Sequence, residues 1–178
     1  KQLGYIYVDT GAMYRAVTYF AMQHNYISEN HFDVKSLIKD LPKVALQFHF
    51  NEEVGFAEMY LNDENVEIAI RTIEVSRLVS KIAEISEVRA KLVEQQQKMG
   101  QHKGIVMDGR DIGTVVFPNA DLKLFMTASP ETKAQRRFEE LLEKGQQVTF
   151  EEVLQNVQER DYIDTHREDS PLVKAEDA

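Results

Sequence analysis

Residues 5–15 change from a strand pattern to a helix pattern within one short stretch, Tyr5-Ile6-Tyr7-Val8-Asp9-Thr10-Gly11-Ala12-Met13-Tyr14-Arg15. The apolar and aromatic run over residues 5–8 predicts a short β-strand. Thr10 is a typical N-cap residue, so a helix is expected to begin there. The predicted helix places on one stripe Met13, Val17, Phe20, Ala21 and His24.

A second junction of this kind lies at residues 104–111, Gly104-Ile105-Val106-Met107-Asp108-Gly109-Arg110-Asp111. Its apolar residues predict a strand that ends in a charged loop, and Leu122–Met126 predicts another strand. Strands that alternate with helices indicate an α/β fold with a parallel sheet. In such sheets functional groups gather at the carboxyl ends of the strands, where Asp9-Thr10 and Asp108–Asp111 are both expected to lie.

Between the two junctions the sequence predicts a small inserted subdomain. A short helix is expected around residues 33–40. Apolar residues then alternate over Val44–Phe50, which is a strand pattern. A turn over Asn51–Gly55 and a return run over Ala57–Leu61 complete a predicted β-hairpin.

Further helices are expected where capping residues precede apolar stripes. Thr72 and Ser86 are predicted to cap two of them. Ser129-Pro130-Glu131 predicts a helix start with proline in the first helical position, and that helix should end near Gly145. Thr149 and Glu152 have the capping-box spacing and predict a last helix.

Composition limits the function classes. The chain has 178 residues, 43% of them apolar and 29% charged, which is ordinary for one globular domain. The net charge of −9 argues against a general nucleic-acid or anionic-membrane binder, since these carry a basic surplus. There is no cysteine, which excludes disulfides, thiolate metal sites and cysteine nucleophiles and fits a cytoplasmic location. No apolar run is long enough for a membrane helix, and nothing demands an oligomer, so a monomer is expected.

Arginines stand beside carboxylates at several places in this acidic chain. The groups are Arg15 after Asp9, then Asp108-Gly109-Arg110-Asp111, then Arg136-Arg137, and finally Arg160, Asp164 and Arg167 on one predicted helix face. Each group alone has an ordinary interpretation as a capped helix, a polar turn or a solvated helix surface. Taken together they indicate a binding site for a phosphorylated, polar small molecule.

One apparent phosphate-loop pattern is rejected. Gly104 and Gly109 have the required spacing, but residues 105–107 form a predicted strand. Arg110-Asp111 also stands where Lys-Ser/Thr is needed, and no other such pattern is present in the sequence.

The chain resembles the bacterial cytidylate kinases, a family of P-loop nucleoside monophosphate kinases, along nearly its whole length. The matching stretches, in order, are residues 7–15, 70–72, 74–76, 88–89, 108–118, 134–137, 159–161 and 170–172. The first and the 108–118 stretch (Asp-Gly-Arg-Asp-Ile-Gly-Thr-Val-Val-Phe-Pro) are the most specific.

The resemblance implies a three-layer P-loop NTPase-type α/β fold. Residues 1–178 would form a single kinase domain, with an acceptor-nucleotide insertion at about 40–100 and a lid at about 130–160. The family's first strand and its phosphate loop do not occur in this sequence, nor do its closing strand and helix. The opening Lys1-Gln2-Leu3-Gly4 reads as the end of a helix. We therefore expect both ends to be incomplete and the chain as written to transfer phosphate weakly, if at all.

The implied reaction is transfer of the γ-phosphoryl group of ATP to CMP or dCMP, with Mg²⁺. Small nucleotides would be the partners, without nucleic acid or membrane, and the implied context is pyrimidine metabolism. Catalytic roles are implied for Arg110, for the lid arginines Arg136 and Arg137, and for Asp108, which would support Mg²⁺ indirectly through water. The implied substrate-binding residues are Thr10, Arg15, Ser80, Arg89, Arg110, Asp111, Arg160, Asp164 and Arg167.

Within that set the resemblance assigns Arg15, Arg110 and Arg167 to the acceptor phosphate, Arg160 and Asp164 to the ribose, and Ser80, Arg89 and Asp111 to the base. The assignment to the base has a chemical rationale. A carboxylate accepts from the cytosine amino group, whereas uracil presents a carbonyl there. The mismatch costs about 1–3 kcal/mol, so CMP should be preferred to UMP. A kinase for UMP or AMP, and a non-catalytic nucleotide-binding protein, remain the alternatives.

Overall fold

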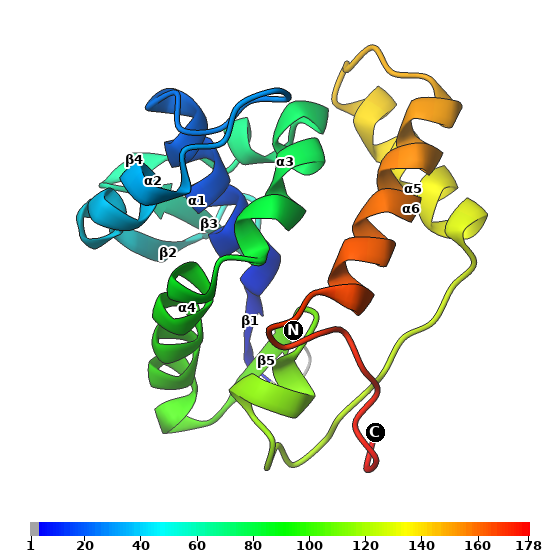
Figure 1. Cartoon of the computed structure of the whole chain (residues 1–178). Helices are drawn as coiled ribbons and strands as arrows, with labels where there is room; N and C mark the ends of the chain where they lie inside the picture. The colour runs from blue at the N-terminus through cyan, green and yellow to red at the C-terminus, as the bar shows by residue number, and fades with distance from the viewer. Residues whose placement is uncertain (1–3) are drawn as a thin grey trace.

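The computed structural model describes residues 4–178 as an α/β arrangement with two separate sheets (Figure 1). The parallel sheet contains β1 (Ile6–Asp9) and β5 (Ile105–Asp108), and the antiparallel sheet contains β2 (Leu46–Asn51), β3 (Phe56–Leu61) and β4 (Glu64–Asn65). The α-helices are α1 (Thr10–Gln23), α2 (Val34–Asp40), α3 (Ile73–Ala83), α4 (Ser86–Met99), α5 (Pro130–Glu143) and α6 (Phe150–His166). Short helical turns are η1 (Leu41–Lys43), η2 (Ala69–Arg71), η3 (Gly100–His102) and η4 (Ile112–Val116). The predicted α/β class with a parallel sheet is confirmed.

The two strand-to-loop junctions lie side by side, as predicted. β1 and β5 pair in parallel with Asp9 opposite Asp108, so both carboxylates stand at the carboxyl edge of the sheet. The Thr10 hydroxyl donates to the backbone carbonyl oxygen of Asp108 at 2.6 Å and ties the two junctions together. The sheet therefore brings together residues that are about a hundred positions apart in the chain.

The predicted hairpin is confirmed, and it gains a third strand. β2 pairs with β3 in the register Leu46 opposite Leu61. The chain then reverses at Asn62 and Asp63, both with positive φ, and β4 pairs with the end of β3. Asn and Asp tolerate this backbone conformation, which favours a tight two-residue turn. A two-residue strand is too short to show a periodic pattern, so the sequence did not predict β4.

Most of the predicted helix caps are confirmed. The Thr72 hydroxyl accepts from the backbone N–H of Val75, and Ser129 caps α5 ahead of Pro130. Thr149 and Glu152 form the complete capping box at the start of α6. The predicted end near Gly145 is also correct, since α5 ends at Glu143 and Gly145 has a φ of +73°.

Three local predictions were wrong. Asp9, not Thr10, caps α1, because its carboxylate accepts from the Ala12 N–H while Thr10 turns to Asp108. Ser86 does not cap α4 but is its first residue, after Ile85. Residues 122–126 form no strand, because no strand in the described part of the chain pairs with them. The helix end predicted over residues 1–3 lies outside the described residues.

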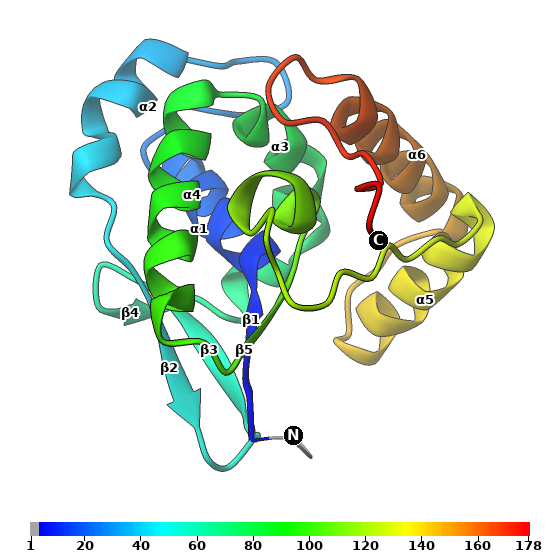
Figure 2. The same cartoon turned by 90° about the horizontal axis from the view of Figure 1, so that it is seen from below.

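Two hydrophobic clusters support the fold. The larger one joins α1, α2, α3, α4 and the hairpin through buried residues that include Met13, Leu37, Met59, Ile82 and Leu92. The smaller one holds α5 against α6 through Ala134, Leu141 and Val153. Figures 1 and 2 show the α5–α6 pair standing beside the main body, next to α3, at the end of a long extended connection from η4.

Two ranges of the chain correspond to the subdomains that the family resemblance implied. The range 40–100 contains the antiparallel sheet with α3 and α4, and the range 130–160 contains α5 and most of α6. Their roles as acceptor insertion and lid stay predictions, as does the monomeric state. In residues 4–178, no helix combines the length and the apolar character needed to cross a membrane.

Candidate active site

A cavity of about 400 Å³ opens at the carboxyl edge of the parallel sheet, between the start of α1, α3 and the C-terminal half of α6. The structure brings eleven of the twelve predicted site residues to its lining: Thr10, Arg15, Ser80, Arg89, Asp108, Arg110, Asp111, Arg137, Arg160, Asp164 and Arg167. The twelfth, Arg136, is exposed on α5 and is not part of the lining.

The cavity has the opposite charge balance to the chain as a whole. Its lining contains seven arginines (Arg15, Arg71, Arg89, Arg110, Arg137, Arg160, Arg167) and five carboxylates (Asp9, Asp108, Asp111, Asp164, Glu140). In a protein of net charge −9, this local cationic surplus favours an anionic ligand.

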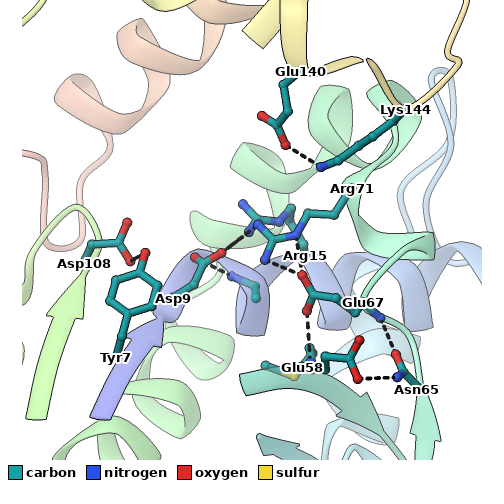
Figure 3. A network of polar contacts seen from close by, with 12 residues as sticks. Tyr7, Asp9, Arg15, Glu58, Asn65, Glu67, Arg71, Asp108, Glu140 and Lys144 are labelled. Carbon is teal, nitrogen blue, oxygen red and sulfur yellow. Dashed lines mark hydrogen bonds and ion pairs between the residues drawn. The ribbon is translucent and has the colours of Figure 1, made fainter. Parts of the chain in front are cut away.

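At one end of the cavity, Asp9 is shared by two arginines (Figure 3). Its Oδ2 accepts from Arg15 Nη2 at 2.7 Å and from Arg71 Nη1 at 2.7 Å. Its Oδ1 accepts from the Ala12 N–H at the start of α1. Although burial opposes ionisation, Arg15 and Arg71 hold the pKa of Asp9 below its ordinary value.

Guanidinium groups crowd around this end of the cavity. Burial lowers the pKa of Arg160 to about 10, and the nearby charges of Arg110, Arg15 and Arg137 act in the same direction. Burial also lowers the pKa of Arg15, with Arg71 and Arg137 adding to the shift. The buried Nε–H groups of Arg15, Arg137 and Arg160 have no acceptor within residues 4–178. An anion with several oxygens would relieve the repulsion and supply these acceptors.

Asp108 stands at the edge of the same region. Desolvation and the negative charge of Asp9 raise the pKa of its carboxyl above the ordinary value. Tyr7 donates its hydroxyl to Asp108 Oδ1 at 3.0 Å (Figure 3). Asp108 thus presents a carboxylate toward the cavity next to the cationic cluster.

At the other end, a buried ion pair joins Arg89 of α4 to Asp111 of the loop after β5. Arg89 also donates to the backbone carbonyl of Ala83, and its guanidinium lies over the Tyr14 ring, 5.8 Å from the ring centre. The Tyr14 hydroxyl is buried and has no hydrogen-bond partner in residues 4–178. Ser80 is buried and also lines the cavity. This end therefore offers a carboxylate, a guanidinium and two hydroxyls in a confined space.

Asp164 connects the two ends. Its carboxylate accepts from Arg110 Nε at 2.8 Å and lies 3.5 Å from Arg167 Nη1. Asp164 is on the last turn of α6, and Arg167 is the residue that ends this helix. Arg160 and Asp164 share the predicted helix face, whereas Arg167 lies just beyond the helix with an extended backbone; all three line the cavity.

Comparison with known proteins decides the family. A family model described as Cytidylate kinase matches residues 1–178. A protein named cytidylate kinase from Flavobacterium johnsoniae is 71% identical over all of this chain and 77% of its own length. Proteins of the same name from Flavobacterium psychrophilum and Phocaeicola vulgatus are 67% and 53% identical, over all of this chain and 79% and 78% of their own lengths.

The chain belongs to the cytidylate kinase family. It is therefore an enzyme, a phosphotransferase that acts on nucleotides. Its α/β architecture is consistent with the P-loop kinase fold that the family resemblance implied.

Arg71 and Tyr14 are two of the cavity residues for which no role was predicted. Arg71 was noticed only within a matching stretch, yet it contacts Asp9. Tyr14 lies within the first matching stretch, residues 7–15, but no role was assigned to it. Its buried hydroxyl has no hydrogen-bond partner in the described chain. Helical spacing could have indicated Tyr14, because it lies four residues after Thr10 and therefore shares its face of α1. No local signal indicated Arg71, because its partner Asp9 is 62 residues away.

Acid should destabilise the protein through Asp9. Since the folded pKa of Asp9 is depressed, its stabilisation is complete above the unfolded pKa, about 3.9. It is lost as the pH falls through the lower folded pKa. Melting temperatures measured from pH 6 to pH 2 should therefore fall less steeply for Asp9→Asn than for the wild type. If the melting temperatures of the two proteins fell equally over this pH range, the depressed pKa of Asp9 would be contradicted.

Gly109→Ala should lower activity strongly. A Cβ at this position would lie 2.4 Å from Thr10 Oγ1 and 2.9 Å from Ile112 Cδ1. The added methyl group must therefore displace the Thr10–Asp108 link and with it the loop that carries Arg110. We expect a drop in kcat/KM of about tenfold or more, about 1.4 kcal/mol. Gly145→Ala, where a Cβ would meet no atom within 4 Å but the φ of +73° strains the backbone, is the comparison for a strained glycine substitution outside the cavity.

Proposed function

We propose that the cavity binds CMP or dCMP and that the enzyme transfers the γ-phosphoryl group of ATP to it, forming CDP or dCDP and ADP. The observation that carries the proposal is the cationic cluster in which the buried Nε–H groups of Arg15, Arg137 and Arg160 have no acceptor among residues 4–178. Such groups suit phosphate oxygens, since guanidinium groups bind phosphate through paired N–H donors. The buried Arg89–Asp111 pair at the other end supports a base with both donors and acceptors.

In this proposal Arg15, Arg110 and Arg167 bind the acceptor phosphate, and Thr10 lies beside it. Arg160 and Asp164 hold the ribose, and Ser80, Arg89 and Asp111 read the cytosine. The charged neighbours of Arg160 are Arg110, Asp164, Arg15 and Arg137, which also puts its guanidinium within reach of the phosphate. The charged neighbours of Arg167 are Arg89, Asp164 and Asp111, so its guanidinium lies where the base end of the cavity meets the residues proposed for the ribose.

In the transfer step an oxygen of the acceptor phosphate bonds to the γ-phosphorus of ATP while the bond from that phosphorus to the ADP oxygen breaks. Positioning and charge stabilisation dominate this chemistry, so no general base is required. Arg137 reaches the cavity from α5, and Arg110 reaches it from the β5 loop. Both would neutralise the charge of the group in transfer. Arg136, on the exposed side of α5, would meet the donor only through movement of the lid.

Mg²⁺ fits the residues present if it is held mainly by water and by substrate phosphates. Within residues 4–178 no cluster of three or more metal-ligating side chains exists, but Asp108 provides a carboxylate at the cavity edge. Magnesium is commonly bound in this way, through one or two carboxylates, waters and substrate phosphates. Asp108 would hold it indirectly through water, and the bound ion would offset the charge of the phosphates.

A coupled assay of ADP release tests the proposal directly. The intact enzyme, complete with the donor-binding phosphate loop that the family resemblance implies, is supplied with ATP, Mg²⁺ and one acceptor at a time: CMP, dCMP, UMP or AMP. We expect turnover with CMP and dCMP and weaker turnover with UMP. No CMP-dependent ADP release would overturn the kinase assignment, and faster turnover with UMP or AMP would favour another monophosphate kinase.

Asp111→Asn tests the reading of the base. An amide can turn either its oxygen or its nitrogen toward the base, so it can meet uracil as well as cytosine. The ratio of kcat/KM for CMP to that for UMP should fall by about tenfold, about 1.4 kcal/mol. An unchanged ratio would show that Asp111 does not recognise the base. The assignment of the phosphate-binding residues would still stand.

A further inference from the structure

Arg71 lies between two carboxylates that belong to different parts of the fold. Its Nη1 donates to Asp9 Oδ2 at 2.7 Å, and its Nε donates to Glu67 Oε1 at 2.8 Å (Figure 3). Glu67 is buried, and its Oε2 accepts from the backbone N–H of Met59 in β3 at 3.0 Å. A continuous chain of hydrogen bonds therefore runs from the antiparallel sheet to the start of α1.

Arg15 and Arg71 meet on the same oxygen of Asp9, but their surroundings differ. Arg71 has a second carboxylate partner, Glu67, whereas Arg15 has Asp9 as its only ion-pair partner in the described chain. The negative charges of Asp9 and Glu67 outweigh the effect of burial and raise the pKa of Arg71. Burial lowers the pKa of Arg15. Arg15 is thus the guanidinium that gains more from a new anion.

A phosphate that binds Arg15 must compete with Asp9. If Arg15 were the only partner of Asp9, its departure would leave a largely buried carboxylate without a counter-ion, which is costly. Arg71 removes that cost, because it keeps its own hydrogen bond to Asp9 when Arg15 turns away. The anchorage of Arg71 on Glu67 and β3 keeps it from following Arg15 toward the ligand.

We propose that Arg71 is a positioning residue that keeps Asp9 ionised and in place while Arg15 exchanges Asp9 for the phosphate of the nucleoside monophosphate. The proposal rests on the proposed function, in which Arg15 binds that phosphate. It predicts that Arg71 affects the binding of the phosphate group and leaves the binding of the nucleoside part unchanged.

Calorimetric titration with CMP and with cytidine, which lacks the phosphate, separates this role from a merely structural one. In Arg71→Met the preference for CMP over cytidine should fall about tenfold, with cytidine affinity unchanged. Arg71 also accepts from Arg137 Nη2 through its backbone carbonyl, a contact that the substitution leaves intact. Arg77→Met, which removes an arginine outside this cavity, should leave the preference unchanged.

The double variant Asp9→Asn/Arg71→Met provides the decisive comparison. Asparagine is an equally good N-cap, so α1 keeps its start. Without the charge on Asp9 there is nothing for Arg71 to compensate, and the preference for CMP should return to within threefold of the wild type. A tenfold loss that persists in the double variant, or an equal loss for CMP and cytidine in Arg71→Met, would overturn the proposal.

Controls keep this test separate from the proposed function itself. If the wild type binds CMP no better than cytidine, or Arg15→Met leaves the preference intact, the assignment of Arg15 to the phosphate fails. If Arg15→Met abolishes the preference and Arg71→Met leaves it unchanged, only the role of Arg71 fails. Should Arg71→Met not fold, Arg71→Lys takes its place. This variant keeps one positive charge for Asp9 and should stay within threefold of the wild type, and a tenfold loss would contradict the proposal.

Discussion

Asp111→Ala is expected to lower the free energy of unfolding by about 3–5 kcal/mol, because it leaves a buried guanidinium without its counter-ion. Arg89 is 2% exposed and Asp111 is 5% exposed, so the pair is almost fully shielded from water. The remaining carboxylate near Arg89 belongs to Asp169, whose Oδ1 lies 3.8 Å from Arg89 Nε. Thermal denaturation followed by circular dichroism should show a melting temperature lower by about 6–20 °C for a domain of this size.

A matched double variant separates the cost of the lone charge from the value of the pair. Arg89→Met/Asp111→Leu removes both charges and should be more stable than Asp111→Ala, since apolar replacement of a whole buried pair is often neutral. A melting temperature of Asp111→Ala within 2 °C of the wild type would contradict the burial of this pair.

Asp164→Ala should reduce kcat/KM for CMP by about 30-fold to 1000-fold, equivalent to about 2–4 kcal/mol. Asp164 orients Arg110 through the 2.8 Å contact with its Nε and lies against Arg167. Without the carboxylate Arg110 loses the partner that orients it, and the ribose loses its proposed acceptor. Arg167 loses its counter-ion but keeps two hydrogen bonds to the Ser170 carbonyl, at 2.9 and 2.7 Å. Steady-state kinetics of the coupled reaction measure the change.

Asp161→Ala on the same helix is the control for Asp164→Ala. Asp161 pairs with Lys133 of α5 and does not line the cavity, so its loss should change kcat/KM by less than twofold. Equal effects of the two substitutions, or a change below threefold for Asp164→Ala, would mean that Asp164 does not organise the site.

The parts of the site that the sequence could predict depend on local rules. Asp9 and Asp108 end apolar runs, and parallel pairing brings such ends to one edge of the sheet. Thr72, Ser129 and Thr149 are short polar residues ahead of apolar stripes, and each caps its helix. These features depend on a few neighbouring residues, which a sequence displays directly.

The parts that could not be predicted depend on tertiary contacts. Arg136 and Arg137 are adjacent, but successive helical residues point about 100° apart, and only Arg137 lines the cavity. Which one does so is decided by the packing of Ala134 and Leu141 of α5 against α6. Similarly, residues 122–126 have the composition of a strand but lie with Leu122, Leu124 and Met126 largely exposed, because pairing depends on a neighbour that local composition does not specify.

The ion-pair partners of the site residues could not be predicted from the sequence either. Asp9 and Arg15 belong to one sequence motif, but the second contact of Asp9 comes from Arg71, 62 residues away. The buried pairing of Arg89 with Asp111 joins α4 to the loop after β5. The family resemblance implied that both residues touch the base, but it did not imply that they pair with each other. Only the fold brings these charges within hydrogen-bond distance.

A crystal structure of the protein with CMP is the most direct test of the central claim that one cavity recognises a pyrimidine nucleoside monophosphate. The account predicts the phosphate within hydrogen-bond distance of Arg15 and Arg110, the ribose beside Asp164, and the cytosine amino group directed at Asp111. Electron density for CMP outside this cavity, or inside it with the base among the arginines of the phosphate end, would contradict the account.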